Sequence, residues 1–467
     1  MKIEFFGAAR TVTGSKHLIT LEDGKKILLD CGMFQGMGKE TDPLNRHFGF
    51  EPSEISALVL SHAHIDHSGL IPRLVNEGFK GKIYCTEATY DLCEIMLQDS
   101  ARIQEADTVF LNKKRVAKGL PRLKPLYSVK DVDACLKHFE KRPFAQEFRI
   151  FTDVHCTFTD NGHILGSAAV LLRVIEENKE TKIAFTGDIG RYGSPLMNDP
   201  KPFPQADILL CESTYGNRLH EKPEDSTQEL LEIVLETCVQ NKGRLIIPAF
   251  SLGRTQELVY TLNNLSLSGK LPPIKIYVDS PLSYSATNIV RKHLECLNEH
   301  VRETAKTDPD PFGFEQLIYI TDKKDSQALN EHNEPCVIIS ASGMAEAGRI
   351  RHHIRHSIAH AKNTILLVGY AEPHSLGGQL RAGRAEVKIF GELFPVRAKV
   401  KIIESYSAHG DYNDMLKYLS CQDASQIKHV FLVHGEYETQ KEWKKKLHEA
   451  GYRNIDIPEK NDHFIFY

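Results

Sequence analysis

Four side chains that can bind a metal ion lie within six positions of one another in the first part of the chain. They are His62, His64, Asp66 and His67, in the run S-H-A-H-I-D-H-S-G. Neutral imidazoles and a carboxylate suit zinc, and too few cysteines lie nearby for a structural zinc site built from thiolates. Solvated surface histidines usually occur singly, so the run predicts a metal site, and we expect it to hold two ions.

The residues around this run predict how its donors are presented. The apolar residues 55–60 predict a buried strand, and Gly69 and Pro72 flank the start of an amphipathic stretch. The run therefore lies on a loop between a strand and a helix. Such a loop can direct the first two histidines one way and the last two donors another.

Two further candidate donors also follow predicted strands. His163 lies between strands predicted at 151–158 and 168–174, and Asp188 follows a strand predicted at 182–185. A lone loop histidine is usually structural, but polar residues at successive strand ends can meet in one site. We expect both residues to join the metal site, with the carboxylate suited to bridge two cations.

A third predicted strand, at 26–30, ends in the carboxylate of Asp30 within L-L-L-D-C-G. By itself this would be an ordinary turn aspartate. A histidine that binds a metal usually donates its other N–H to a carboxylate or a similar acceptor. Asp30 is therefore expected to hold the imidazole of one of the metal ligands.

Composition describes an ordinary globular protein. The 467 residues are 41% hydrophobic and 26% charged with a formal charge of −4, which predicts two or three domains. The ten cysteines are scattered without a C-x-x-C pair, which is typical of a reducing compartment. No stretch approaches the ~20 apolar residues of a membrane span, and no signal-like segment is present. We expect a cytoplasmic protein with no membrane association.

The second half of the chain predicts a separate α/β unit. Strands at 244–248, 275–278 and 336–340 alternate with helical patterns, which indicates a parallel sheet flanked by helices. After residue 369 the chain returns to short strands, with His409 and His434 at loop or strand ends. These histidines can join the first site only if the C-terminal segment packs on the N-terminal domain. The α/β unit is then an insertion, and we expect the active site in the cleft between the domains.

The motifs together resemble a known family. H-A-H-I-D-H, the later G-H and T-G-D, and L-L-D-C-G resemble the metallo-β-lactamase fold. C-E-S-T-Y-G (211–216), S-A-H-G-D (407–411) and V-H-G-E (433–436) are similar to the additional motifs of the β-CASP ribonucleases. The resemblance runs from residue 3 to about 440. It implies an α/β protein, a metallo-β-lactamase αββα sandwich with an inserted β-CASP domain. The expected parts are 1–211 and 373–467 for the sandwich and 212–372 for the insertion.

The resemblance also implies a mechanism. One zinc would be held by His62, His64 and His163, and the other by Asp66, His67 and His434, with Asp188 bridging. A hydroxide held between two zincs can attack the phosphorus of RNA in line. His409 would protonate the leaving 3′-oxygen, with Glu212 holding its ring and raising its pKa. The expected catalytic residues are Asp66, Asp188, Glu212 and His409. The alternative is that Glu212 is a helix-start acid and His409 a turn residue, because neither has spacing evidence of its own.

Substrate contacts are predicted from two further features. S-A-S-G-M offers small residues and backbone N–H groups that can bind a phosphate, and an arginine opens another helix. The expected phosphate-binding residues are Ser340, Ser342, Gly343 and Arg254, although ordinary loops have the same pattern. The pattern of residues 87–106 predicts a long helix. Beyond it, residues 111–130 contain seven Lys or Arg and no acid. This run is either a solvated face or a contact for a phosphate backbone.

Several functions remain open at this point. A zinc-dependent ribonuclease acting on single-stranded RNA is expected, in endonucleolytic or 5′-to-3′ exonucleolytic mode. A DNA-processing β-CASP nuclease is the nearest alternative, but in that branch the last motif usually lacks its histidine, so His434 favours RNA. A non-catalytic scaffold would have lost ligands, and a thioester or lactone hydrolase would not need the insertion. A homodimer is left open.

Overall fold

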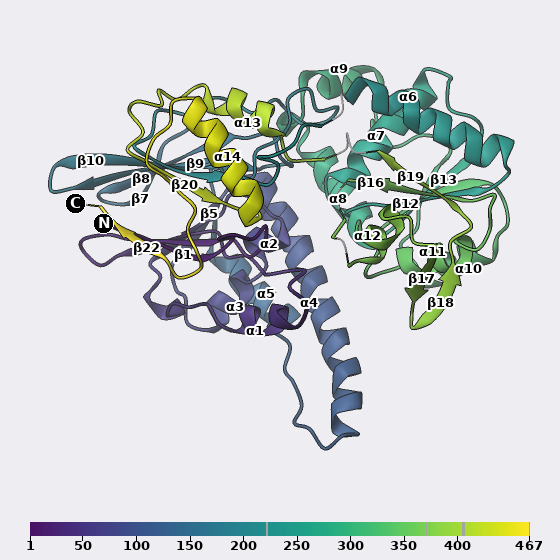
Figure 1. The fold of residues 1–467 in the computed structure, drawn as a ribbon, viewed down its shortest axis with the longest axis horizontal. Coiled ribbons are helices and arrows are strands. Elements are labelled where there is room, and N and C mark those ends of the chain that lie inside the picture. Colours follow the sequence, from purple (N-terminus) through teal and green to yellow (C-terminus); the bar gives the residue numbers. More distant parts are fainter. Residues whose placement is uncertain (221–222, 370, 373, 404–406, 467) are drawn as a thin grey trace. The chain divides into compact units, whose positions relative to one another are not determined.

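The computed structural model describes residues 1–220, 223–369, 371–372, 374–403 and 407–466, without the side chains of 223–225. The chain divides into two compact units. Unit 1 comprises Met1–Tyr192, Asp199–Leu219 and His409–Tyr467, and unit 2 comprises Gly193–Asn198 and His220–Ala408. Figure 1 shows the ribbon with its elements labelled. Among the described helices, none has both the length and the apolar character that crossing a bilayer requires.

Unit 1 contains two seven-stranded sheets. The first sheet has the order β22 (His463–Ile465), β1 (Lys2–Gly7), β2 (Lys16–Thr20), β3 (Lys26–Leu29), β4 (Ala57–Val59), β5 (Lys82–Cys85) and β6 (Phe139–Lys141). The second has the order β21 (Ile455–Asp456), β20 (His429–Val433), β11 (Ile208–Glu212), β10 (Lys179–Phe185), β9 (Ala168–Glu176), β8 (Val154–Asp160) and β7 (Phe148–Phe151). The helices of this unit are α1 (Thr41–Arg46), α2 (Ile65–Ser68), α3 (Ile71–Asn76), α4 (Glu87–Val116), α5 (Val129–Cys135), α13 (Tyr412–Leu419) and α14 (Tyr437–Glu449).

The two sheets of unit 1 pack face to face. Along β8, buried side chains alternate with less buried ones, and the buried set joins a core with Phe5 of the first sheet and Phe431 of the second. On the outer face of the second sheet, Trp443 of α14 and Tyr418 of α13 pack in a separate core. The expected αββα sandwich is confirmed.

The C-terminal segment of the chain belongs to this sandwich. β20 pairs in parallel with β11, with Phe431 opposite Leu210, and β22 pairs with β1. The expected return of the chain to the N-terminal domain is therefore present. It places the loops that carry His409 and His434 in the same unit as the early histidine run.

Unit 2 is built on a six-stranded sheet whose pairs are all parallel. Its order is β14 (Leu317–Tyr319), β13 (Lys275–Asp279), β15 (Cys336–Ser340), β12 (Arg244–Pro248), β16 (Thr364–Val368) and β19 (Lys399–Ile403). A hairpin is formed by β17 (Glu386–Ile389) and β18 (Glu392–Pro395). The helices are α6 (Pro223–Val234), α7 (Arg254–Leu267), α8 (Pro281–Lys292), α9 (Glu299–Thr307), α10 (Lys323–Glu331), α11 (Ile350–Ser357) and α12 (Leu376–Arg381). β12, β15 and β16 are buried along their whole length, as parallel strands covered on both faces must be.

The limits of the insertion differ from those expected at 212 and 372. The chain passes from the sandwich into unit 2 after Leu219 and returns to the sandwich at His409. The later return arises because β19 pairs with β16 and so belongs to the unit 2 sheet. A short strand gives no sign in sequence of which sheet it joins. Residue 373, where the last part was expected to begin, lies outside the described residues.

The helix that follows β5 is longer than expected. The pattern predicted a helix over 87–106, whereas α4 continues to Val116. Lys and Arg are good helix formers, and three of them in the last turn interact favourably with the helix dipole. The first part of the basic run is therefore helical.

Candidate metal centre

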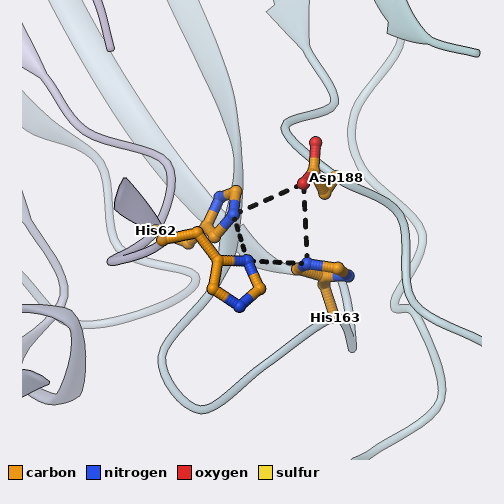
Figure 2. Close-up of side chains that lie close together, drawn as sticks. His62, His163 and Asp188 are labelled. Atoms are coloured by element: carbon orange, nitrogen blue, oxygen red, sulfur yellow. Dashed lines mark hydrogen bonds and ion pairs between the residues drawn. The ribbon is translucent and has the colours of Figure 1, made fainter. Parts of the chain in front are cut away.

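One group of donor atoms brings together three histidines and an aspartate. His62 Nε2 lies 3.2 Å from His64 Nδ1, which lies 3.3 Å from His163 Nε2. Asp188 Oδ2 lies 3.4 Å from His62 Nε2 and 3.5 Å from His163 Nε2. Figure 2 shows His62, His163 and Asp188 converging from separate loops. All four donor atoms lie within 4.8 Å of one another.

A second group of donors adjoins the first and shares an atom with it. His434 Nε2 lies 3.2 Å from His67 Nε2 and 3.3 Å from Asp66 Oδ2. Asp188 Oδ2, the same oxygen that faces the first group, lies 3.3 Å from His67 Nε2. The structure thus gathers all seven residues that the sequence predicted as ligands, and it places one carboxylate oxygen of Asp188 against both groups.

The donor spacing fits a tetrahedral metal site. With zinc–nitrogen bonds of about 2.0–2.1 Å, neighbouring ligand nitrogens lie about 3.3–3.4 Å apart. The inward nitrogens of His62 and His434 also carry lone pairs, because the outward nitrogens donate elsewhere. Ser61 Oγ donates to Asp30, so it accepts from His62 Nδ1 at 3.0 Å. Thr214 Oγ1 donates to the His434 carbonyl oxygen, so it accepts from His434 Nδ1 at 3.0 Å.

The protonation of the histidines agrees with a cation site. Burial lowers the pKa of His62 to about 3 and that of His64 to about 4, and it lowers the pKa of His163 well below its usual value. These three imidazoles are neutral at pH 7, as metal ligands must be. For His67, burial lowers the pKa, but the carboxylates of Asp188, Asp30 and Asp66 raise it well above its usual value. A metal ion must displace that proton, so metal affinity should rise with pH.

Asp30 holds His67 in place. It is fully buried, and its Oδ2 accepts from His67 Nδ1 at 2.7 Å and from Ser15 Oγ at 3.2 Å. Its Oδ1 accepts from the backbone N–H of Ser61 at 2.8 Å. One carboxylate therefore fixes the ring of one donor and the loop that carries another.

Asp30→Asn is expected to lower zinc affinity roughly 10- to 100-fold, because it weakens the bond that orients His67. The backbone φ of Asp30 is +59°, which asparagine also tolerates, so the fold should be kept. Competition with a chelator measures the affinity. Ser15→Ala is the matched control, because it removes the 3.2 Å bond to Asp30 and a 3.5 Å contact with His17 Nε2 but keeps the carboxylate. Equal affinities for the two variants would contradict the role of Asp30.

The helical turn α2 carries Asp66 and His67 and is held by the strand-end loop beside it. Ser15 N and Cys31 N donate to the carbonyl oxygens of Asp66 and His67, each at 2.8 Å. A Cβ at Gly32 would lie 1.6 Å from the Asp66 carbonyl oxygen, so only glycine fits there. The L-L-D-C-G motif thus supplies both the carboxylate of Asp30 and the close approach of two backbones.

His409 and Glu212 form a pair beside the first donor group. His409 Nδ1 lies 3.3 Å from Glu212 Oε1, and the His409 ring is centred 4.5 Å from the ring of His163. Glu212 is fully buried, and its two oxygens accept from the backbone N–H groups of Ile189 and Thr214. Burial acts to lower the pKa of His409, but the charge and hydrogen bond of Glu212 raise it to about 9. The imidazolium is therefore the main form at neutral pH.

The residues predicted to bind phosphate all lie in unit 2. Ser340 is buried, and its hydroxyl donates to the Asp279 carbonyl oxygen at 2.8 Å. Arg254 is also buried and forms an ion pair with Glu257 at 2.7 Å. Ser342 Oγ accepts from Ala347 N at 3.4 Å, and the Phe250 ring lies beside Gly343. Phosphate binding by these four residues stays a prediction.

Sequence reasoning missed two hydroxyl residues of the centre, Ser61 and Thr214. Each hydroxyl accepts from the outward nitrogen of a donor histidine. Ser61 directly precedes His62, and Thr214 lies in C-E-S-T-Y-G, a motif noted only for its glutamate. A hydroxyl residue next to a predicted ligand or strand-end acid would have been the available signal.

Comparison with known proteins agrees with this geometry. Residues 13–233 match the metallo-beta-lactamase superfamily, 255–380 the Beta-Casp domain, and 394–458 the Zn-dependent metallo-hydrolase RNA specificity domain. Ribonuclease TTHA0252 of Thermus thermophilus is 34% identical over 94% of each chain. The chain belongs to the β-CASP ribonuclease family. The resemblance inferred from the motifs is confirmed, and the protein is a hydrolase of the metallo-β-lactamase, β-CASP type.

Other β-CASP relatives come from archaea and animals. An RNase J-like protein of Methanocaldococcus jannaschii is 32% identical over 93% of this chain and 92% of its own. Cleavage and polyadenylation specificity factor 73 of Drosophila melanogaster is 30% identical over 93% of this chain and 60% of its own. A solved Enterococcus faecalis protein of unknown function has a TM-score of 0.55 at 13% identity, covering 100% of this chain and 99% of its own. That likeness concerns the fold alone.

Proposed function

We propose that this β-CASP hydrolase is a two-zinc ribonuclease that cleaves phosphodiester bonds in single-stranded RNA during RNA processing or decay. The observation that carries the proposal is the position of Asp188 Oδ2, which faces both donor groups at 3.3–3.5 Å. A single oxygen shared in this way suits a pair of cations. The names of the two ribonuclease relatives and the presence of His434 favour RNA over DNA.

The ligands divide between the two ions as the donor groups do. Three histidines, His62, His64 and His163, would hold one zinc. Asp66, His67 and His434 would hold the other, with Asp188 between them. Zinc ions bound there would activate a water molecule for attack and neutralise charge on the phosphate.

His409 would act as the general acid. Its side chain is 21% exposed, so it can reach a leaving group, and Glu212 at 3.3 Å keeps it protonated. With a pKa of about 9, most of the imidazole holds its proton at pH 7 and loses it only as the pH rises through that value. A proton donor for the leaving 3′-oxygen is what RNA cleavage needs from this chain.

The proposed substrate is tested with RNA and DNA of the same sequence. The zinc-loaded protein is incubated with 5′-labelled and internally structured strands, and the products are separated by size. Cleavage of RNA alone is expected. Mononucleotides would indicate exonucleolytic attack and longer fragments endonucleolytic attack. Faster cleavage of DNA would replace the proposal with a DNA-processing nuclease, and no cleavage of either would leave a non-catalytic scaffold.

Protein purified without chelator is expected to contain about two zinc ions per chain, because two donor groups share one oxygen. Metal analysis of the folded protein measures the ratio. A ratio near zero in active protein would contradict the two-metal centre, and a ratio near one would contradict the bridging role of Asp188. The cytoplasmic location and the homodimer stay predictions.

A further inference from the structure

The second half of α4 forms an arm that leaves the body of unit 1. The helix buries side chains as far as Ala101, but none of the residues from Arg102 to Val116 is buried. At 1.5 Å per residue this stretch is about 22 Å long. Figure 1 shows this end of α4 projecting away from the sheets of unit 1. We call residues 102–120 the arm.

One side of the arm is covered by the chain segment that returns from it. Asn112 pairs with the backbone of Leu123 through both ends of its amide, at 2.8 and 3.0 Å. Arg115 Nε donates to the Pro121 carbonyl oxygen at 2.8 Å. These bonds fix the returning segment along the side of the helix that carries Asn112 and Arg115.

The opposite side of the arm carries an exposed apolar stripe. Ile103, Val109, Phe110 and Val116 are each 51–59% exposed. At about 100° per residue these four side chains and Ala106 fall within one arc of the helix, whose centre lies opposite Arg115. Arg102 and Lys113 lie near the centre of the same arc, so the stripe is apolar with a basic side chain toward each end. Six of the sixteen large apolar side chains that are exposed in the described residues lie in the arm. A concentration of this kind marks an interaction surface.

The charges of this segment are segregated along the chain. Residues 87–107 contain six acids and one base, and residues 108–130 contain seven bases and no acid. In the described structure, no carboxylate lies within 4.0 Å of the amino groups of Lys113, Lys114 and Lys118. Such a helix is complementary to an antiparallel copy of itself, because each basic end then meets Glu105 and Asp107 of the other helix.

We propose that two copies of this chain associate through their arms, packed antiparallel about a twofold axis near Phe110. Phe110 then meets the same residue of the second copy, and Ile103 lies near its Ala117. Asp107 and Lys114 lie on the same flank of the stripe, three residues before Phe110 and four residues after it. A twofold axis places the same flank of both helices on the same side of the pair, and the two helices then run in opposite directions. Asp107 therefore lies close to Lys114 of the second copy.

The alternative occupant of the arm is RNA, which its cations would attract. RNA offers little surface that could cover aliphatic side chains such as Ile103 and Val109. The acids at Glu105 and Asp107 would also repel its phosphates. The stripe and the charge segregation together therefore favour a second copy of the chain.

Sedimentation of the full-length protein over a range of concentrations tests the proposal. The wild type is expected to form a dimer, and Phe110→Glu should weaken it at least about tenfold. Leu111→Glu is the matched control, because Leu111 is 45% exposed on the arm but lies off the stripe. It should leave the dimer intact. Circular dichroism checks that each variant keeps its helix.

A charge exchange tests the antiparallel register. Asp107→Lys and Lys114→Asp should each weaken the dimer, because like charges then meet. The double variant should restore it, because opposite charges meet again. A chain that stays monomeric at every concentration would overturn the proposal. Equal effects of Phe110→Glu and Leu111→Glu on the dimer would also overturn it. So would a double variant that dimerises more weakly than both single variants. A monomeric protein whose RNA affinity falls on loss of Lys113, Lys114 and Lys118 would show that the arm binds RNA instead.

Discussion

Asp188→Asn is expected to lower RNA cleavage by at least ~10³-fold, since loss of several kcal/mol of charge stabilisation corresponds to that factor. The change removes the one negative charge that faces both donor groups. Two zinc ions would then repel each other without the carboxylate between them, so zinc content should also fall. Metal analysis and a single-turnover cleavage assay measure the two effects.

The fold of the Asp188→Asn variant should survive, because the cores of the sandwich lie elsewhere. Asp207→Asn is the matched control. Asp207 precedes β11 in the same unit and accepts from Lys182 N at 2.8 Å, outside both donor groups. It should cleave RNA normally. Wild-type cleavage and two bound zincs in the Asp188 variant would show that this residue does not bridge.

His409→Ala is expected to reduce RNA cleavage by roughly 10² to 10⁴ while leaving both zinc ions bound, which is the usual contribution of a general acid. Its ring lies beside His163 and is not part of either donor group. His434→Ala should instead lower zinc occupancy, because it deletes a donor of the second group. Zinc content thus separates two histidines that lie 25 residues apart in one segment.

A substrate whose leaving group needs no proton tests the role of His409 as general acid. The His409→Ala variant should hydrolyse an aryl phosphodiester at close to the wild-type rate while its RNA cleavage stays low. Glu212→Gln should show the same contrast between the two substrates with a smaller loss of RNA cleavage, because the pKa of His409 would be lower without the carboxylate. If the rates of RNA cleavage and of aryl phosphodiester hydrolysis fall by the same factor, His409 positions substrate or metal and does not donate the proton.

The residue types of the candidate centre could be predicted from the amino-acid sequence alone. Candidate ligands such as His62 and Asp188 could be predicted because several imidazoles and carboxylates cluster in one run and at successive strand ends. The strands were predictable for a similar reason, since burial imposes alternating or continuous apolar patterns on them. The motif around Asp30 indicated a carboxylate that holds one of the clustered imidazoles, and Asp30 Oδ2 lies 2.7 Å from His67 Nδ1.

Which of these residues lie together could be seen only once the chain was folded. His434 reaches Asp66 across 368 positions because β20 pairs with β11, and no local pattern encodes the partner of a strand. The shared oxygen of Asp188, the hydroxyls of Ser61 and Thr214, and the later limit of the insertion at β19 all depend on such pairings. The exposure of the stripe on the arm could not be predicted either. An apolar face of a helix has the same sequence pattern whether the fold covers it or leaves it open to solvent.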